Sequence, residues 1–330
     1  MPKQKKKHTH TVQKEYLKNF AVEENGKFFL WRLDKKTGKI IRLAIDIISV
    51  ENYFYPQDIE EWLANSIEAR GISAIKKVIL QKSISKLTSL EKENIARWII
   101  VQDLRTKEYR NELEQGIEQM AKKILDRQFL PQEITENIQI SMGSDPIKNI
   151  QMSMMKKLQK YAPIIAKNYH WTLIKNDTKT LYYTSDHPVV RDNSYLNVMK
   201  KIMNHKTLGS GRGYFSKGVE FHLPLNSNLK LVLMNLEPLN EMLREIWNAI
   251  NENPEIYRIL WIPFPHKKIK QLRSDELHAE FENILNFNEK ITGWSNRFIL
   301  SKDNDFKIAQ ELLKRRPDFK NENRKRWEID

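Results

Sequence analysis

From residue 58 to about residue 166 the apolar residues recur at helical spacing, and this pattern predicts a large helical segment. The first apolar stripe consists of Ile59, Trp62, Leu63 and Ile67. Thr88, with Glu91 three residues later, matches a capping box and predicts the start of a long helix. We therefore expect a helical lobe over residues 57–168.

Strand-like segments flank this helical lobe on both sides. Segments 27–33 and 39–45 surround Asp34–Gly38, where Gly38 can adopt the positive φ of a hairpin turn. Ahead of the hairpin, Tyr16, Leu17 and Phe20 stand at helical spacing. In the second half of the chain we expect strands at 171–175, 180–184, 219–225, 230–234, 258–262 and 297–301, and helices at 237–250, 275–288 and 306–315.

Together these patterns predict an α+β fold, in which an N-terminal β-hairpin and a C-terminal, mostly antiparallel sheet enclose an inserted helical lobe. The expected divisions are a basic disordered tail (1–9), a helix and hairpin module (10–56), the helical lobe (57–168), an α+β lobe sharing a core with 10–56 (169–302), and a C-terminal helix with a basic tail (303–330). A chain of 330 residues is long enough to bury a sizeable core.

The long predicted helix carries two polar residues on or beside its apolar face. That face contains Ile95, Trp98, Ile99, Tyr109, Leu113 and Ile117. Gln102 lies in the middle of the stripe and Arg105 lies beside it, so both side chains need hydrogen-bond partners if they are buried. The partners are either backbone groups at a helix junction or a ligand in an internal site, since a guanidinium binds carboxylate or phosphate through two parallel hydrogen bonds.

Several short motifs resemble those of a family catalogued as domain of unknown function 4238. The first is carried by His10, Tyr16, Leu17, Asn19 and Phe20, and the others are Leu-Trp-Arg-Leu-Asp (30–34), Val-Glu-Asn-Tyr-Phe-Tyr (50–55), Gln-Asp-Leu-Arg-Thr (102–106), Thr-Ser-Asp-His-Pro-Val (184–189) and Phe-His-Leu-Pro-Leu (221–225). The resemblance runs from His10 to about Leu300, with one departure at Gln13, where the family usually has proline. Because the family has no established activity, the resemblance implies no function and no catalytic residue.

The motif at 184–189 places a hydroxyl, a carboxylate and an imidazole where a β-prone segment stops at Pro188. Proline lacks a backbone donor and restricts the residue before it, so strand pairing should end close to this position. Ser185 and Asp186 are therefore candidate catalytic residues, together with His10, Gln102 and Arg105. The alternatives are that Asp186 only caps the following backbone in an Asx-type turn and that His10 caps the first helix.

A cationic, glycine-rich loop follows between residues 199 and 218. It contains no acid, and its candidate nucleic-acid contacts are Lys200, Lys201, Lys206, Arg212, Tyr214 and Lys217. Positive charge with nearby aromatic rings suits a phosphate backbone and unpaired bases. The alternative is a solvated surface loop without a ligand.

A metal site is a further candidate in the same region. Glu220 and His222 alternate with apolar residues, so they share one face of a strand. If segments 180–185 and 219–225 pair, Asp186 and His187 would approach them, and such a set suits Mn²⁺, Zn²⁺ or a general acid–base pair. The alternative is the ordinary polar face of a half-solvated strand.

Composition narrows the remaining options. The chain has no cysteine, which excludes disulfides, thiolate nucleophiles and iron–sulfur clusters and fits a cytoplasmic location. No apolar run approaches the roughly 20 residues of a membrane span. A net charge of +14, from 56 basic and 42 acidic residues, favours polyanionic partners.

The sequence therefore supports two hypotheses of different class, and neither establishes that the protein is an enzyme. The first is a protein that binds RNA or DNA, extending to a nuclease-like enzyme of a mobile-element or antiviral system that uses Mg²⁺ or Mn²⁺. The second is a non-catalytic scaffold or protein-interaction module in which the polar motifs are structural. A Walker A loop, a Gly-x-Ser-x-Gly elbow, a His-Glu-x-x-His motif and the kinase signatures are all absent from the sequence.

Overall fold

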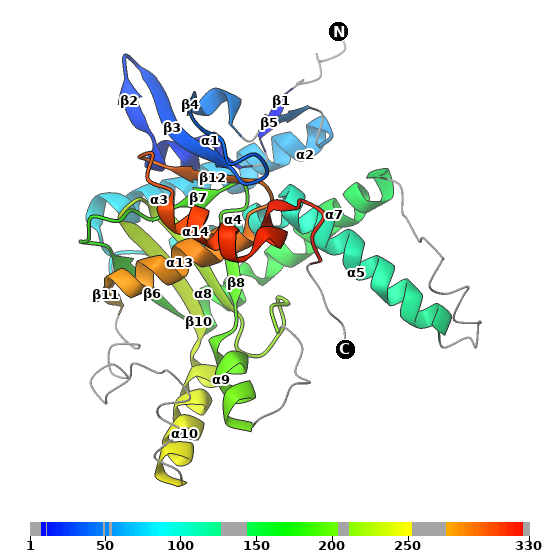
Figure 1. Ribbon diagram of the computed structural model, residues 1–330, viewed down its shortest axis with the longest axis vertical. Helices are drawn as coiled ribbons and strands as arrows, with labels where there is room; N and C mark the ends of the chain where they lie inside the picture. Colours follow the sequence, from blue (N-terminus) through cyan, green and yellow to red (C-terminus); the bar gives the residue numbers. More distant parts are fainter. Residues whose placement is uncertain are drawn as a thin grey trace.

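A computed structural model describes residues 8–10, 12–48, 50–52, 55–126, 144–203, 211–252 and 275–325, and it has the predicted α+β fold. The hairpin strands β2 and β3 lie at one end of the molecule, and helices α9 and α10 lie at the other (Figure 1). The strands are β1 (His8–His10), β2 (Val22–Glu24), β3 (Lys27–Asp34), β4 (Ile40–Ala44), β5 (Val50–Asn52), β6 (Tyr169–Lys175), β7 (Thr184–Ser185), β8 (Val190–Asp192), β9 (Glu220–Asn226), β10 (Leu229–Asn235), β11 (Glu276–His278) and β12 (Phe298–Ser301).

The helices occupy most of the remaining described residues. The α-helices are α1 (Lys14–Leu17), α2 (Gln57–Trp62), α3 (Ala69–Gln81), α4 (Ser89–Leu104), α5 (Lys107–Asp126), α7 (Ser144–Leu158), α8 (Ala162–Asn168), α9 (Ser194–Met203), α10 (Leu236–Glu252), α13 (Phe281–Trp294) and α14 (Lys307–Arg315). The short turns of 3₁₀ or π type are η1 (Lys18–Phe20), η2 (Ile45–Ile47), η3 (Leu63–Glu68), η4 (Gln159–Tyr161) and η5 (Pro317–Lys320).

The predicted N-terminal hairpin is confirmed, and it belongs to a sheet that joins the two ends of the chain. Strands β3 and β4 pair antiparallel around Gly38, which has φ +73° and donates its N–H to the carbonyl of Asp34 at 2.7 Å. On its other edge β3 pairs with β12, and β12 pairs in turn with β7. The sheet therefore has the order β2-β3-β12-β7, with β4 on β3.

The second sheet has the order β11-β6-β10-β9-β8 and is antiparallel except between β11 and β6. The pairing of 180–185 with 219–225, on which the candidate metal site depended, does not form, because β7 pairs with β12 and β8 occupies the position beside β9. Residues 181–183 lie outside the ladder because other groups satisfy their backbone. The N–H of Tyr182 donates to the carbonyl of Ser227 at 2.9 Å, and the N–H of Tyr183 donates to the side chain of Asn288 at 3.0 Å.

The helical lobe forms as predicted, but its long helix is two helices. The capping box at its start is present, with Glu91 N–H donating to Thr88 Oγ1 at 3.2 Å and Thr88 N–H to Glu91 Oε2 at 2.8 Å. Helix α4 ends at Leu104, and α5 begins at Lys107 with the Oγ1 of Thr106 accepting from the N–H of Tyr109 at 3.3 Å. Because Thr106 caps the start of α5, the apolar face that the sequence assigns to one continuous helix is divided between α4 and α5.

One further sequence prediction is wrong in part, and others concern residues outside the described ranges. The helix expected at 275–288 is wrong at its start, because 276–278 form β11 and α13 begins at Phe281. The strand expected at 258–262 lies outside the described residues, as do most of the basic tails at 1–9 and after 325.

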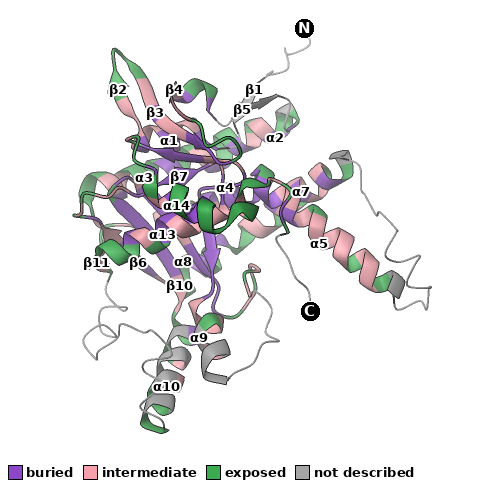
Figure 2. Ribbon diagram, in the orientation of Figure 1, coloured by how far each residue is buried: buried purple, intermediate pink, exposed green. Residues whose placement is uncertain are grey.

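Buried apolar side chains are concentrated around the second sheet and α4 (Figure 2). One cluster extends from Val12 to Leu300 and packs α3, α4 and α8 against one face of the sheet, where Phe221 and Leu231 are fully buried. A smaller cluster centred on Phe287 lies between α13, α14 and the hairpin sheet. Among the described helices, none combines the length and the apolar character that crossing a membrane requires.

Candidate functional site

The motifs that are far apart in the sequence meet in the structure. The hydroxyl of Tyr16 lies 2.9 Å from Thr184 Oγ1 and donates to the carbonyl of Pro224 at 2.8 Å, which joins the first, the 184–189 and the 221–225 motifs. Gln13 takes part in this junction, since its N–H lies 3.4 Å from Gln102 Oε1 and its Oε1 accepts from Trp98 Nε1 at 2.7 Å. A proline at position 13 would lack both groups, so the departure from the family pattern adds two contacts here.

A buried polar cluster connects the 102–106 motif with the 184–189 motif. The Nδ1 atom of the His187 imidazole contacts Thr106 Oγ1, and its Nε2 atom lies 3.1 Å from Asp103 Oδ1. All three side chains are fully buried. Asp103 also accepts from the Tyr214 hydroxyl and pairs with Arg191, whose Nε lies 3.0 Å from Asp103 Oδ2. Burial alone would oppose ionisation of Asp103, but the charges of Arg191 and His187 outweigh it and hold the pKa of this carboxyl below its usual value.

Arg191 links this cluster to a second carboxyl in a contrasting environment. Its guanidinium forms an ion pair with Glu112 of α5 while it also pairs with Asp103. Burial raises the pKa of Glu112, and the charge of Arg191 offsets this only in part. Two carboxyls therefore share one arginine, one with a lowered pKa and one with a raised pKa.

Glu112 and Arg191 face a cavity of about 410 Å³ between α5, β8, α13 and the segment after α14. The cavity is lined by Glu108, Glu112, Val190, Arg191, Asp192, Arg212, Asn286, Glu289, Lys290, Gly293, Trp294, Leu312, Phe319, Arg324 and Lys325. This volume falls within the usual range of small-molecule sites. Acidic and basic side chains thus line a space with an apolar wall of Trp294, Leu312 and Phe319.

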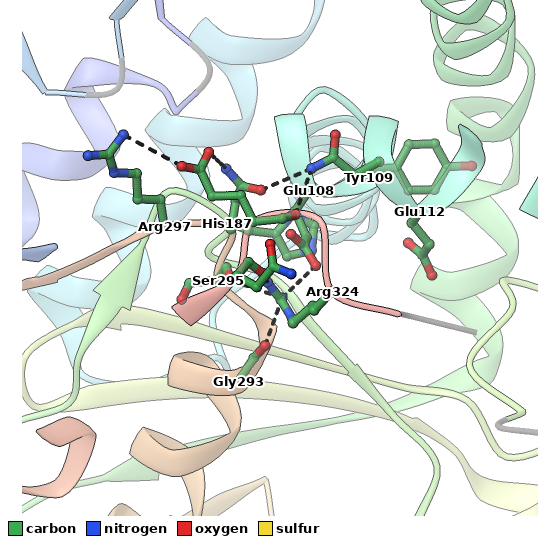
Figure 3. Close-up of polar contacts among 12 residues, drawn as sticks. Glu108, Tyr109, Glu112, His187, Gly293, Ser295, Arg297 and Arg324 are labelled. Carbon is green, nitrogen blue, oxygen red and sulfur yellow. Dashed lines mark hydrogen bonds and ion pairs between the residues drawn. The ribbon is translucent and has the colours of Figure 1, made fainter. Parts of the chain in front are cut away.

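The segment after α14 holds one wall of the cavity in place through Arg324. Its guanidinium donates to Glu108 Oε1 at 2.7 Å and to the carbonyls of Gly293 and Ser295 at 2.9 and 3.0 Å (Figure 3). The two carbonyls belong to the C-terminal end of α13, where unpaired carbonyl groups favour a cation. Arg324 therefore fixes α5, α13 and the C-terminal segment to one another.

The structure gives Ser185 and Asp186 structural partners. Ser185 Oγ accepts from the N–H of His187 at 3.0 Å and donates to the carbonyl of the same residue at 2.8 Å, so Ser185 forms the local turn. Asp186 instead accepts three backbone N–H groups of 296–298, at 2.9, 2.7 and 2.9 Å. Neither side chain lines the cavity.

Gln102 and Arg105 are buried, as expected, and each has partners within the protein. Arg105 forms an ion pair with Glu68, and its carbonyl accepts from the Tyr55 hydroxyl at 2.7 Å. Their neighbours Asp103 and Thr106, in the same motif, contact His187 instead. His10 lies in β1 opposite Val50, and the position of its side chain is not among the described features.

The four candidate metal ligands do not converge. His222 Nε2 lies 3.1 Å from Glu220 Oε2 on the face of β9 directed at α13, whereas Asp186 and His187 contact the partners named above. The reason is the strand order, since β7 pairs with β12 instead of β9. Over the described ranges, no three His, Asp or Glu side chains group as a metal site would require.

The predicted cationic loop is described in part. Arg212 lines the cavity with its guanidinium carbon 5.3 Å from the centre of the Trp294 ring. Tyr214 packs against Phe221 at 5.6 Å between ring centres, so its ring is part of the core and not an exposed stacking surface. Lys217 forms an ion pair with Glu241. The side chains of Lys200 and Lys201 and the whole of Lys206 lie outside the described residues.

Sequence reasoning missed the residues that line the cavity, chiefly Glu108, Glu112, Arg191, Trp294 and Arg324. Three signals were available. Asp103 lies inside a recognised motif, and Arg191 follows another motif by two residues. The spacing of Glu108 and Glu112, four residues apart on one helix, was the third. None of these signals shows which elements enclose the same space.

One comparison with known proteins found a match. A family described as "Protein of unknown function (DUF4238)" matches residues 8–305, which is most of the chain and includes all six motifs. The match ends before α14 and the segment that carries Arg324. Neither the curated proteins nor the solved structures gave a match.

Proposed function

The chain belongs to the DUF4238 family, and because that family carries no assigned activity, we propose from the site itself that the protein binds nucleic acid. One observation carries the proposal: a cavity of about 410 Å³ that is lined by five cationic side chains. In this proposal the cavity receives one nucleotide unit of a strand. The net charge of +14 supports a polyanionic partner in the same way.

Five basic and four acidic side chains line the cavity, and the small excess of positive charge supports an anionic ligand. Arg191, Lys290 and Arg324 are paired with carboxylates of the cavity wall or its surroundings. Arg212 and Lys325 are exposed, and neither has an ion pair with another described residue. Two cations are therefore available to contact phosphate groups.

Trp294 adds a group suited to a nucleotide. Its ring lines the cavity together with Leu312 and Phe319, and the guanidinium carbon of Arg212 lies 5.3 Å from the ring centre. Nucleic-acid bases stack on aromatic rings of this kind, so the apolar wall suits a base.

The salt dependence of binding tests this proposal. We expect labelled single-stranded RNA or DNA to bind with an affinity that falls as salt rises, because each phosphate contact releases counterions. Replacing Arg212 and Lys325 by alanine together should lower the slope of log affinity against log salt by roughly 1.4 to 1.8, as expected for two lost contacts. Fluorescence anisotropy over a series of salt concentrations measures the slope.

The matched control removes two positive charges elsewhere. Lys36 and Lys39 are exposed at the β3–β4 turn, and neither lines the cavity. The variant Lys36→Ala with Lys39→Ala has the same net charge as the first variant, so its slope should stay close to that of the wild type. Equal slopes for the two variants would show that the cavity does not contact the nucleic acid.

A scaffold or protein-interaction module is the second candidate, and one observation favours it. Gln102, Arg105, Ser185 and Asp186 all have partners within the protein. Absence of salt-sensitive binding to RNA and DNA in the same titration would favour the scaffold. Under either candidate we propose a cytoplasmic location, as expected for a chain without cysteine.

A further inference from the structure

Two carboxylates of α5 face the cavity together with the cations that suit a phosphate. Glu108 and Glu112 are four residues apart, so they lie on one face of the helix, and both line the cavity. Arg191 and Arg212 line it as well. We propose that the cavity is an active site for RNA cleavage, in which Glu112 is the general acid and Glu108 the general base. This inference rests on the proposed function, because it requires a nucleotide unit in the cavity.

The two carboxylates differ in ways that match these two roles. Glu108 pairs with Arg324, whose guanidinium lies 2.7 Å from Oε1, and this ion pair favours the charged form that accepts a proton. Glu112 also pairs with an arginine, Arg191, but burial raises the pKa of Glu112 and Arg191 is shared with Asp103. Two carboxyls whose environments separate their protonation states are the arrangement that acid–base catalysis requires.

The charged groups around Glu112 come from β8, α4, the turn between β7 and β8, and α5 itself. Arg191 of β8 forms the ion pair, and Asp103 of α4 lies on the other side of that arginine. His187 and Glu108 act on Glu112 through their charges, the first favouring ionisation and the second opposing it. Figure 3 shows Glu108 and Glu112 on the same helix, with Arg324 beside Glu108. The surroundings of Glu112 thus contain charges of both signs.

RNA is the substrate class because its own 2′-hydroxyl can serve as the nucleophile. The 2′-oxygen attacks the adjacent phosphorus and forms a new P–O bond, while its proton passes to the Glu108 carboxylate. The P–O5′ bond breaks, and the Glu112 carboxylic acid gives its proton to the departing 5′-oxygen. The products are a 2′,3′-cyclic phosphate and a 5′-hydroxyl, and no water or oxidant is consumed. Arg212 and Lys325, the exposed cations of the cavity, stabilise the negative charge that grows on the phosphoryl oxygens.

The test uses the full chain and a labelled single-stranded RNA, with a version carrying 2′-deoxyribose at every position as the second substrate. We expect cleavage of the RNA alone, with ends that contain a 2′,3′-cyclic phosphate and a 5′-hydroxyl. Glu112→Gln should lower the cleavage rate about 100-fold or more, the effect typical of losing a general acid. Products with a 5′-phosphate, or cleavage of the deoxy substrate, would overturn the mechanism.

The matched control is Glu114→Gln, which makes the same change at an exposed position of α5 that does not line the cavity. Its cleavage rate should equal that of the wild type. Glu112→Asp is the second catalytic variant, because it keeps the carboxyl if Glu112→Gln fails to fold. It should retain cleavage at a reduced rate, and the fall in rate at high pH, caused by deprotonation of the acid, should shift in this variant.

The readouts separate the inference from the proposed function. If RNA does not bind at all, the proposed function fails and the inference fails with it. If RNA binds with the expected salt dependence but is not cleaved, or if Glu112→Gln cleaves like the wild type, only the catalytic inference is overturned. Anisotropy measures binding, and gel analysis of product ends measures cleavage.

Discussion

Asp186 shows how a side chain in a prominent motif can act entirely through the backbone. Its two carboxylate oxygens accept the N–H groups of three consecutive residues, 296–298, at 2.7 to 2.9 Å. These residues connect α13 to β12, and the N–H of Asp186 donates back to the carbonyl of Phe298 at 3.1 Å. Asp186 therefore fixes the end of β7 to the start of β12.

Asp186→Asn should for this reason impair stability and leave the function of the folded protein intact. Asparagine offers one acceptor oxygen to three N–H groups and directs its own N–H groups at them, so we expect a loss of about 1–3 kcal/mol in the free energy of unfolding. Urea denaturation measures the loss. Asp177→Asn, at an exposed carboxylate paired with His278, should change stability by no more than about 0.5 kcal/mol. A similar small change at Asp186 would contradict the backbone role.

At the scale of single residues, the sequence identified which residues have structural importance but not which groups they contact. Gln102 and Arg105 were correctly expected to be buried, and Asp186 to stand at a strand end. The partners of Asp186 lie at least 110 residues away in the chain, beyond the range of any local pattern.

At the scale of elements, the C-terminal segment is fixed along one side of α5. Glu108 pairs with Arg324, while the amides of Asn111 and Gln115 donate to the carbonyls of Glu322 and Arg324 at 3.2 and 2.9 Å. Helical spacing aligns these three α5 residues, so the segment follows the helix axis. The attachment also includes the partly exposed Lys107–Glu322 pair and the Phe319 ring beside Gly293, and the buried Arg324–Glu108 pair is the contact that is most costly to break.

Arg324→Ala should cost about 3 kcal/mol in the free energy of unfolding, because it leaves a buried carboxylate and two carbonyls of α13 without their cation. Arg316→Ala, which breaks an exposed pair with Asp318, should cost less than about 1 kcal/mol. Combining Arg324→Ala with Glu108→Gln should cost less than the sum of the single changes. Equal losses for the two arginine variants, measured in urea, would show that Arg324 does not anchor the segment.

The elements themselves were largely predictable, and the exceptions have physical causes. The hairpin, the capping box at Thr88 and most strands followed from periodicity and turn residues. The break between α4 and α5 did not, because Thr106 caps the second helix without a glycine or proline to mark the boundary. The segment before β7 has strand-like residues but bonds to Asn288 and Ser227, and only the folded protein brings these groups to it.

For the whole molecule, the sequence predicted the fold class and not the order of the strands. Alternating apolar residues show that a segment has a buried face, but they do not select its neighbour. The choice of β12 over β9 as the partner of β7 decides that Asp186 and His187 stay apart from Glu220 and His222. The cavity likewise depends on α5, β8, α13 and the C-terminal segment meeting, which no motif encodes.

The layer between the second sheet and α13 contains a buried lysine that influences the stability of the whole molecule. Lys230 is 5% exposed, and its Nζ lies 4.6 Å from the centre of the Phe287 ring and 5.6 Å from that of Tyr182. Burial, with the nearby charge of Lys290, lowers the pKa of Lys230 to about 7, while Glu220 and Asp192 oppose this shift. In the unfolded chain the pKa of a lysine is near 10.4.

This difference in pKa makes the stability of the protein depend on pH with a definite sign. Between about pH 7 and 10 the unfolded chain binds the proton of Lys230 and the folded protein releases it, so the free energy of unfolding rises with pH over this window. Below pH 7 both states hold the proton, and the cost of a buried ammonium is present in full. Lys230→Met removes the charge at similar volume and should therefore stabilise the protein most at pH 6, by up to a few kcal/mol.

Urea denaturation of the wild type and of Lys230→Met at pH 6, 7.5 and 9 measures this effect. The difference between the two proteins cancels the titration of most other groups, and it should shrink steadily from pH 6 to pH 9. Lys302→Met, at an exposed lysine after β12, is the matched control and should give a small difference that does not vary with pH. A constant difference for Lys230→Met would mean that Lys230 keeps its proton in the folded protein. In that case the rings of Phe287 and Tyr182, with Glu220 and Asp192, would stabilise the ammonium enough to offset its burial.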